Sequence, residues 1–371
     1  MEELLQQFLE PRSALVLLGV VAVSLVALSK FADLVVDYAV VLSERSGVPK
    51  VVIGATVVSL GTTAPEVAVS VLAAFQGNPG LAMGNAVGSI ICDTGLILGV
   101  ACLIRPLSIP WAIANRQGWI QLVAGILLVT LSVPWSSPLS MFESGFVGQF
   151  PRWAGFLFLV LLAAYLYASV AWSRSAKRVA VADDKAANEQ AAETGAATIE
   201  VVDATEHEED EPTGASGAII VKLILSIVGV LLSANILIPA VTILARRVNI
   251  PESVLAATLV AFGTSLPELV TAVNAARRGH GDLAVGNIIG ADILNALFVA
   301  GAAAAVTPGG LEVAESFYQV TFPAMLFVLV VFRVGIYACR TELSRRFGTV
   351  LLVAYLIYLG VSAAAGVSPG H

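Results

Sequence analysis

Two hexapeptides in the chain place a glutamate beside hydroxyl groups within long apolar stretches. The segment Gly61–Glu66 (GTTAPE) returns 202 residues later as Gly263–Glu268 (GTSLPE). A charge inside a membrane costs several kcal/mol unless something compensates for it, so a repeated buried acid indicates a site. Carboxylate and hydroxyl oxygens are the ligands that hard cations such as Ca2+ and Na+ prefer. The repeat predicts one cation site whose centre is Glu66 and Glu268, with four hydroxyl neighbours, Thr62, Thr63, Thr264 and Ser265.

A second polar cluster follows each hexapeptide. The segments Gly88–Asp93 (GSIICD) and Gly290–Asn295 (GADILN) each place a carboxylate or an amide about a turn beyond a glycine. We expect symmetry to bring both clusters to the midplane, so that Glu66, Asp93 and Glu268 surround one centre. Such a site is strongly anionic when it is empty. One divalent ion, several monovalent ions or protons would fill it, and mutual exclusion of these fillings is the physical basis of antiport.

The prolines of the hexapeptides predict how the site is positioned. Pro65 and Pro267 have no N–H group and suit the first turn of a helix, so each span is expected to break into two half-helices. The break should free backbone carbonyls near Ser59 and Ala261, which is tolerable in hydrocarbon only where a polar group, water or an ion replaces the lost partner. The glutamates then lie in a first helical turn, where the helix dipole favours negative charge.

Composition places the chain in the membrane class. Hydrophobic residues make up 57%, charged residues 13%, and the mean hydropathy is +0.87, which lies outside the soluble globular range. The three cysteines show no paired spacing, and none of the three histidines falls in an apolar run, so a transition metal is not indicated. We expect no cofactor, no catalytic residue and no nucleic acid partner. The expected partners of a monomeric chain are the lipid bilayer, Ca2+ and Na+.

Ten apolar spans follow from hydropathy. They are Ala14 to Leu42, Val48 to Gln76, Leu81 to Ile104, Ala112 to Val133, Arg152 to Trp172, Ala218 to Leu244, Val254 to Arg277, Leu283 to Val306, Phe317 to Ile336 and Phe347 to Ala365. The predicted fold is an all-α polytopic membrane protein with two five-helix repeats, residues 1–172 and 218–371. The repeated blocks cover 51–99 and 253–301. The linker 173–217 holds 11 of the 27 acidic residues and reads as a solvated acidic run.

An odd number of spans in each half makes the two repeats an inverted pair, since the second half must enter the membrane from the opposite side. The Lys and Arg residues set the orientation. With the N-terminus outside, only four of them flank spans on the outer side, Arg12, Arg152, Arg246 and Arg247. The sequence predicts a cell (inner) membrane protein with both termini outside and the acidic linker in the cytoplasm.

The two hexapeptides and their following clusters resemble the alpha-repeats of the cation/calcium antiporter superfamily, the prokaryotic sodium/calcium exchanger type in particular. The resemblance covers both repeats, the ten spans and the linker. It implies Ca2+ exchange for Na+ by alternating access, in which the first and sixth spans slide across the remaining helices. The ligands that the resemblance implies are Glu66, Glu268, Thr62, Thr63, Thr264, Ser265, Ser89, Asp93, Asn295 and the carbonyls of Ser59 and Ala261.

The chain departs from the family pattern at its second clusters. The usual Gly-Ser-Asn is Gly-Ser-Ile in the first half and Gly-Ala-Asp in the second, so Ile90, Ala291 and Asp292 are unusual. Asp292 precedes Asn295 by three residues and either adds a fourth carboxylate to the site or forms a salt bridge or hydrogen bond in helix packing. We favour packing. An added carboxylate would alter the coupling ion or the stoichiometry.

Three further functions compete with Na+/Ca2+ exchange. Proton coupling keeps the fold, but proton-coupled relatives tend to carry Gly-Asn-x-x-Glu, whereas this chain has Gly-Thr-x-x-Pro-Glu. An intramembrane aspartyl protease would use Asp93 and Asp292 as its dyad, without the Gly-x-Gly-Asp context and with no role for the glutamates. A passive channel is disfavoured, because inverted broken helices with a midplane site are typical of alternating access.

Overall fold

A computed structural model describes residues 8–143, 145–169, 171–172, 216–247 and 264–364. Within these ranges the chain is almost entirely helical. Eight helices are long and apolar enough to cross a membrane, and the bent pair Lys50–Thr62 and Ala64–Phe75 makes a ninth candidate span. The first part of the predicted span Val254 to Arg277 lies outside the described residues. The protein is therefore a multi-pass membrane protein.

The described helices of the first half follow the predicted spans closely. They are α2 (Ala14–Ser46), α3 (Lys50–Ile53), the π-helical η1 (Gly54–Val58), α4 (Ser59–Thr62), α5 (Ala64–Phe75), α6 (Pro79–Ile91), the π-helical η2 (Cys92–Ile97), α7 (Leu98–Ile104), α8 (Trp111–Ser132) and the span Arg152–Ser169. A 3-10 turn, η3 (Pro138–Phe142), lies in the loop after α8.

The second half contains the corresponding elements. They are α10 (Ser216–Arg247), α12 (Leu266–Arg277), α13 (Gly281–Leu294), the π-helical η4 (Asn295–Ala300), α14 (Gly301–Val306), the π-helical η5 (Phe317–Thr321), α15 (Phe322–Cys339) and α16 (Arg345–Ala364). The sequence did not predict the π-helical segments. Such segments occur most often at functional sites.

Two short antiparallel strand pairs correct the prediction of a purely helical fold. Strand β1 (Leu107–Ser108) pairs with β4 (Glu342–Leu343), and β2 (Val147–Pro151) pairs with β3 (Gly310–Ala314). Each pair joins one strand from the first half to one from the second. The loops that carry them satisfy their backbone groups in this way at the ends of the helices.

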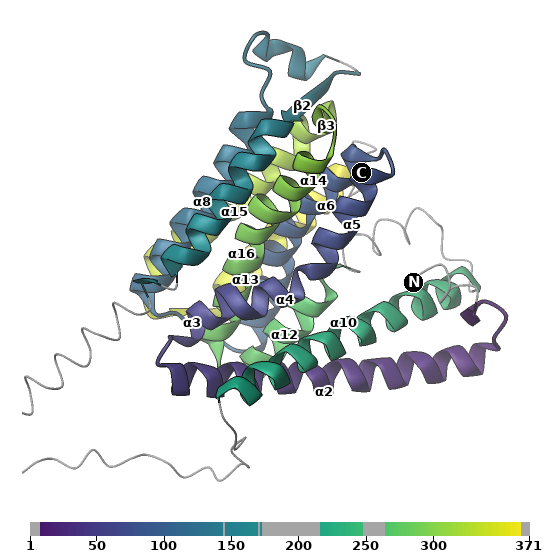
Figure 1. The fold of residues 1–371 in the computed structure, drawn as a ribbon, viewed down its shortest axis with the longest axis vertical. Coiled ribbons are helices and arrows are strands. Elements are labelled where there is room, and N and C mark those ends of the chain that lie inside the picture. Colours follow the sequence, from purple (N-terminus) through teal and green to yellow (C-terminus); the bar gives the residue numbers. More distant parts are fainter. Residues whose placement is uncertain (1–7, 144, 170, 173–215, 248–263, 365–371) are drawn as a thin grey trace, which may run out of the picture.

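Helices α2 and α10 form a pair that lies obliquely to the other helices (Figure 1). They approach closely, because a Cβ added at Gly229 of α10 would stand 2.3 Å from the Phe31 ring of α2. The pair touches the first helix break, where a Cβ at Gly61 would stand 2.7 Å from the Ile227 side chain. These helices are the first and sixth predicted spans.

Glycines let α13 pack against the first broken span with backbone close to backbone. A Cβ added at Gly286 would stand 2.2 Å from the Val51 carbonyl oxygen, and one at Gly290 would stand 2.5 Å from the Ala55 Cα. From the other side, a Cβ at Gly54 would meet the Leu283 carbonyl oxygen at 2.6 Å. Small residues at helix crossings allow this approach in membranes. The contact fixes α13 relative to the residues that precede the first break.

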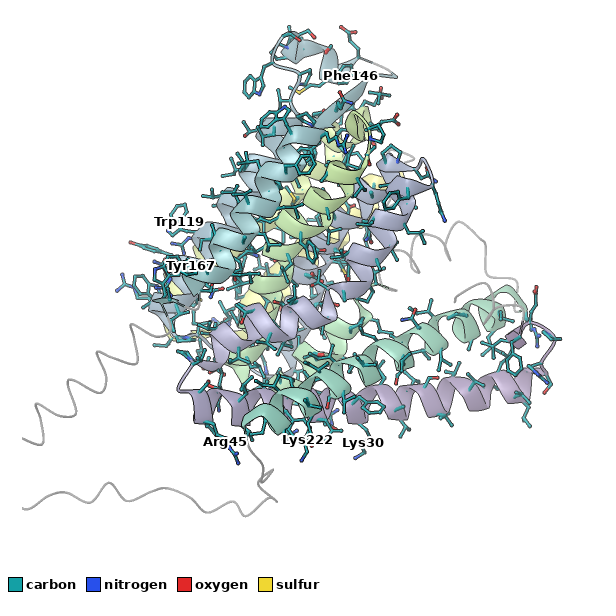
Figure 2. All side chains as sticks on the ribbon, viewed as in Figure 1. Lys30, Arg45, Trp119, Phe146, Tyr167 and Lys222 are labelled. Carbon is teal, nitrogen blue, oxygen red and sulfur yellow. The ribbon has the colours of Figure 1, made fainter. Side chains whose placement is uncertain are left out.

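The basic residues Lys30, Arg45 and Lys222 project from the α2 and α10 pair away from the other helices, whereas Trp119 and Tyr167 lie on the outer face of the bundle (Figure 2). Lys30 is exposed. It therefore does not neutralise the buried glutamates.

Candidate cation site

The first helix break lies between α4 and α5, which meet at an angle of 44°. Pro65 lies in the first turn of α5, and Glu66 follows it with no exposed surface. The expectation for the Ser59 carbonyl is wrong, because the Thr63 amide donates to it at 2.8 Å. Because Pro65 has no N–H group, the carbonyl that loses its helical donor is that of Gly61, four residues earlier. The Ser59 carbonyl also accepts from the Thr62 hydroxyl at 3.4 Å, so each of its two lone pairs has a donor.

The second hexapeptide leads into α12, which starts at Leu266 with Pro267 in its first turn. Ser265 stands at the N-cap position without a side-chain capping bond, and Glu268 is fully buried in the first turn. Both glutamates thus occupy the position where a helix dipole favours a carboxylate. The predicted ligand Ala261 lies outside the described residues.

The two breaks meet through reciprocal hydrogen bonds. Thr63 of the first hexapeptide donates to Oε1 of Glu268 at 3.1 Å, and Ser265 of the second donates to Oε1 of Glu66 at 3.4 Å. Residues 63 and 265 occupy the same repeat position, as do 66 and 268. The two carboxylates lie close enough to interact electrostatically. The first turns of α5 and α12 therefore face each other around one centre.

The remaining hydroxyl residues surround this centre in different ways. Thr62 donates to the Ser59 carbonyl rather than to a carboxylate, and the Ser89 hydroxyl lies 3.4 Å from the Ser265 hydroxyl. Thr264 does not reach a carboxylate and donates instead to Oδ1 of Asn85 at 3.3 Å.

Asn85 connects the two repeats and was not predicted as a site residue. Its amide nitrogen donates to the Glu66 carbonyl at 3.2 Å and to the Ser70 hydroxyl at 2.9 Å, while its oxygen accepts from Thr264. The sequence signal that could have identified Asn85 is that an asparagine, Asn287, stands at the equivalent position of the second repeat. In this way Asn85 holds the Glu66 segment against the second break.

Asp93 and Asn295 face each other as predicted. Asp93 is the second residue of the π-helical η2 and Asn295 is the first residue of the π-helical η4, and the Asn295 amide donates to Oδ2 of Asp93 at 3.3 Å. Asp93 interacts electrostatically with Glu66 and Glu268. The pair thus lies on the same centre as the glutamates.

Asp292 is buried in α13 and accepts hydrogen bonds at Oδ2 from Thr94 of η2 and Gln121 of α8. Hydrogen bonding in helix packing was the favoured alternative for this residue. Thr94 and Gln121 were not predicted. The stretch from Ala112 to Val133 also holds Asn115 and Gln117, so nothing in the sequence singled out Gln121.

The four buried acids leave oxygen atoms without a hydrogen-bond partner. These atoms are Oε2 of Glu66, Oδ1 of Asp93, Oε2 of Glu268 and Oδ1 of Asp292. Across the described part of the chain, none of the four forms an ion pair with Lys or Arg. No three Asp, Glu, His or Cys side chains of the described residues converge tightly enough to hold a metal ion alone. Hydroxyl, amide and carbonyl oxygens must therefore share in any coordination.

Buried acids without a basic partner, at the starts of two facing helices in a multi-pass membrane protein, are typical of a cation transporter. A family model described as "Sodium/calcium exchanger protein" matches residues 16–171 and 218–364. The chain belongs to the sodium/calcium exchanger family.

Two relatives match along nearly the whole chain. The inner membrane protein YrbG of Escherichia coli is 32% identical over 330 residues, covering 89% of this chain and 91% of that protein. The sodium/calcium exchanger MaX1 of Methanosarcina acetivorans is 31% identical over 352 residues, covering 92% of this chain and 97% of that protein. A solved structure of the sodium-calcium exchanger NCX_Mj is similar in fold, with a TM-score of 0.72, 23% identity and coverage of 94% and 99%.

Proposed function

We propose that the protein exchanges Ca2+ for Na+ by alternating access, with Glu66 and Glu268 shared by both ions. The observation that carries the proposal is the reciprocal pair of hydrogen bonds from Thr63 to Glu268 and from Ser265 to Glu66. It brings two carboxylates from separate repeats to one buried centre. Carboxylates with free oxygens and no basic partner need a bound cation or protons to offset their burial.

The proposed ligand shell combines side chains and backbone. Its carboxylates and amide are Glu66, Glu268, Asp93 and Asn295, and its other ligands are Thr62, Thr63, Thr264, Ser265, Ser89 and the carbonyls of Ser59 and Ala261. The geometry favours Thr63, Ser265 and Ser89 among the hydroxyls. Thr63 and Ser265 donate to the two glutamates, and Ser89 lies within hydrogen-bond distance of Ser265. Oxygen-only coordination suits Ca2+ and Na+.

The proposed architecture is an inverted pair of five-helix repeats, residues 1–172 and 218–371, joined by the linker 173–217. The π-helical segments that begin at Cys92 and Asn295 lie at nearly equivalent repeat positions. The family match is also divided into two blocks on either side of the linker. Both features support a duplicated unit, and together with the broken span they support ten crossings.

The oblique α2 and α10 pair is the proposed moving unit. It packs along one side of the other helices and touches the first break through Ile227 and Gly61. Asn274 of α12 also donates to the Ser29 carbonyl of α2 at 3.2 Å. Sliding of the pair would change these contacts beside the site, and would thereby alternate the side from which ions enter.

The proposed location is the inner membrane, with both termini outside and the linker in the cytoplasm. The name of the relative YrbG supports the membrane. The projection of Arg45 and Lys222 from adjoining ends of α2 and α10 supports the orientation, because basic residues collect on the cytoplasmic side (Figure 2).

Proton coupling is the alternative for the driving ion, and the name of MaX1 favours Na+. The protease alternative loses support because the family is one of transporters, although Asp93 and Asp292 do interact electrostatically.

The driving ion is tested with wild-type protein in proteoliposomes. Ca2+ uptake into vesicles loaded with Na+ should depend on the outward Na+ gradient and stop when Na+ is equal on both sides. The matched control uses vesicles without Na+ and an outward proton gradient. Uptake that is equally fast in that control would contradict Na+ coupling and favour protons.

A further inference from the structure

A cluster of arginine and aromatic side chains lies where the end of α15 packs against the start of α8, and it includes none of the residues of the cation site. The two helices approach closely there, because a Cβ added at Gly118 of α8 would stand 3.0 Å from Ile336 and 3.8 Å from the Arg333 side chain of α15. Arg333 donates to Oδ1 of Asn115, and its guanidinium carbon lies 4.6 Å from the centre of the Trp119 ring. The Arg333 side chain is thus held against two residues of α8.

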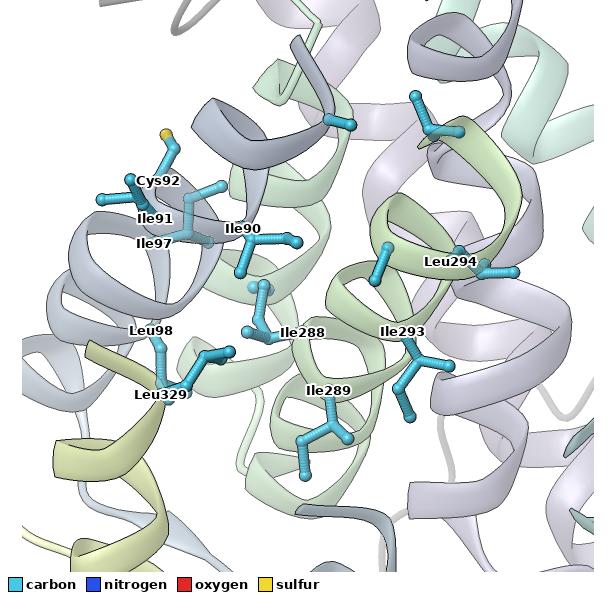
Figure 3. Close-up of a cluster of buried hydrophobic side chains, with 14 of the residues drawn as sticks. Ile90, Ile91, Cys92, Ile97, Leu98, Ile288, Ile289, Ile293, Leu294 and Leu329 are labelled. Carbon is cyan, nitrogen blue, oxygen red and sulfur yellow. The ribbon is translucent and has the colours of Figure 1, made fainter. Parts of the chain in front are cut away.

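Arg333 is buried and lacks acceptors for part of its guanidinium group. Only 8% of the residue is exposed, and its Nε and Nη1 atoms have no hydrogen-bond partner. No ion pair to Arg333 occurs in the described part of the chain. The surroundings are apolar, since Leu329, one turn earlier on α15, belongs to a cluster of buried hydrophobic side chains (Figure 3). The Trp119 ring attracts the positive charge, but it supplies no oxygen acceptor for the remaining N–H groups.

Trp111 and Arg340 extend the cluster toward the ends of the two helices. Trp111 lies one turn before Asn115 on α8, and its indole Nε1 is also buried without a hydrogen-bond partner. The guanidinium carbon of Arg340 lies 5.7 Å from the centre of the Trp111 ring and 5.8 Å from that of the Tyr337 ring. The cluster therefore combines two positive charges with N–H donors that lack an acceptor.

Such a cluster fits an anion whose oxygens only accept hydrogen bonds, and the phosphodiester of a phospholipid is a group of this kind. Trp and Tyr side chains collect at the level of the lipid head groups. Trp119 and Tyr337 are exposed, and Trp119 lies on the outer face of the bundle (Figure 2). In the proposed orientation the end of α15 and the start of α8 face the cytoplasm, where basic pockets between spanning helices bind anionic head groups.

We propose that this cluster binds the phosphate head group of one anionic phospholipid at the seam between α8 and α15. Arg333 and Trp111 donate to the phosphate oxygens, and Arg340 adds a positive charge at the rim. Trp119 and Arg340 are exposed, so their side chains can turn outward and admit the head group to the covered donors. A phospholipid with a positively charged head group fits less well, because the two arginines repel it and form no ion pair with a described carboxylate. The inference is independent of which ions the protein exchanges.

The test measures binding of radioactive phosphatidylglycerol and phosphatidylcholine to the purified, delipidated full-length protein in detergent. Wild-type protein is expected to bind one phosphatidylglycerol per chain, about tenfold more tightly than phosphatidylcholine. Arg333→Gln should weaken this binding about tenfold or more, the size expected for loss of a charge-assisted hydrogen bond. Trp111→Phe should weaken it about fivefold, because it keeps an aromatic ring and removes only the N–H group.

The matched control is Arg346→Gln, which removes the same charge from an exposed position in the first turn of α16. It should bind phosphatidylglycerol as the wild type does, and an equal loss in this control would overturn the proposal by showing general attraction to a basic surface. Wild-type protein that does not prefer phosphatidylglycerol, or that releases it to an equal concentration of inorganic phosphate, would also overturn it. So would a folded Arg333→Gln variant with wild-type binding. Arg340→Gln changes an exposed residue and takes the place of Arg333→Gln if that variant does not fold.

Discussion

Replacing Glu66 or Glu268 with glutamine is expected to abolish Na+-driven Ca2+ uptake into proteoliposomes. Each substitution keeps the size of the side chain and its hydrogen bond from Ser265 or Thr63, but removes a charge that the proposed ion needs. Uptake should fall by about 100-fold or more, because each loss of about 1.4 kcal/mol in ion binding is tenfold. Uptake of radioactive Ca2+ measures the effect.

Asp282→Asn is the control for these variants, because it removes an acid from the end of α13 outside the site. It should transport at the wild-type rate. Both glutamates should be needed equally, since each repeat contributes one of them to the same centre. Full activity of either glutamine variant would show that its carboxylate does not hold the ion.

Replacing Gly290 with alanine is expected to destabilise the protein and reduce transport at least tenfold. The new Cβ would stand 2.5 Å from the Ala55 Cα, 2.6 Å from the Ala55 carbonyl oxygen and 2.5 Å from the Ser59 hydroxyl. Backbone cannot move aside as a flexible side chain can, so α13 must shift away from η1. Overpacking of this kind costs about 1–3 kcal/mol. The shift would also displace Asp292 and Asn295, because α13 continues without interruption into η4.

The thermal midpoint of the purified protein and the uptake rate together measure this effect. Gly360→Ala is the matched control, because Gly360 is exposed on α16 and no described atom lies within 4 Å of an added Cβ. A Gly290→Ala variant with the midpoint and uptake of the wild type would contradict the close packing of α13 on the first broken span.

The features that depend on local chemistry could be predicted from the sequence. Hydropathy located the described spans within a few residues, and Pro65 and Pro267 correctly marked the first turns of α5 and α12. The offset of 202 residues between the hexapeptides indicated that the two glutamates belong to one site. The pairing of Asp93 with Asn295 followed from the same symmetry.

The features that depend on packing could not be predicted. Gln121 lies in an apolar span, and the sequence does not reveal that its face of α8 meets Asp292. The contact of Thr264 with Asn85 depends on how the repeats cross, and the η2 and η4 segments depend on tertiary packing around Asp93 and Asn295. The wrong prediction of a free Ser59 carbonyl had a different origin. A proline removes the hydrogen-bond donor of the carbonyl four residues before it, whereas Ser59 lies six residues before Pro65.

The central claim is that Ca2+ and Na+ compete for one centre between the two helix breaks. Equilibrium binding of radioactive Ca2+ to the purified protein at rising Na+ concentration tests it most directly. We predict that Na+ displaces Ca2+ completely, with a steep dependence on concentration because several Na+ ions replace one Ca2+. Ca2+ binding that is indifferent to Na+ would contradict the account.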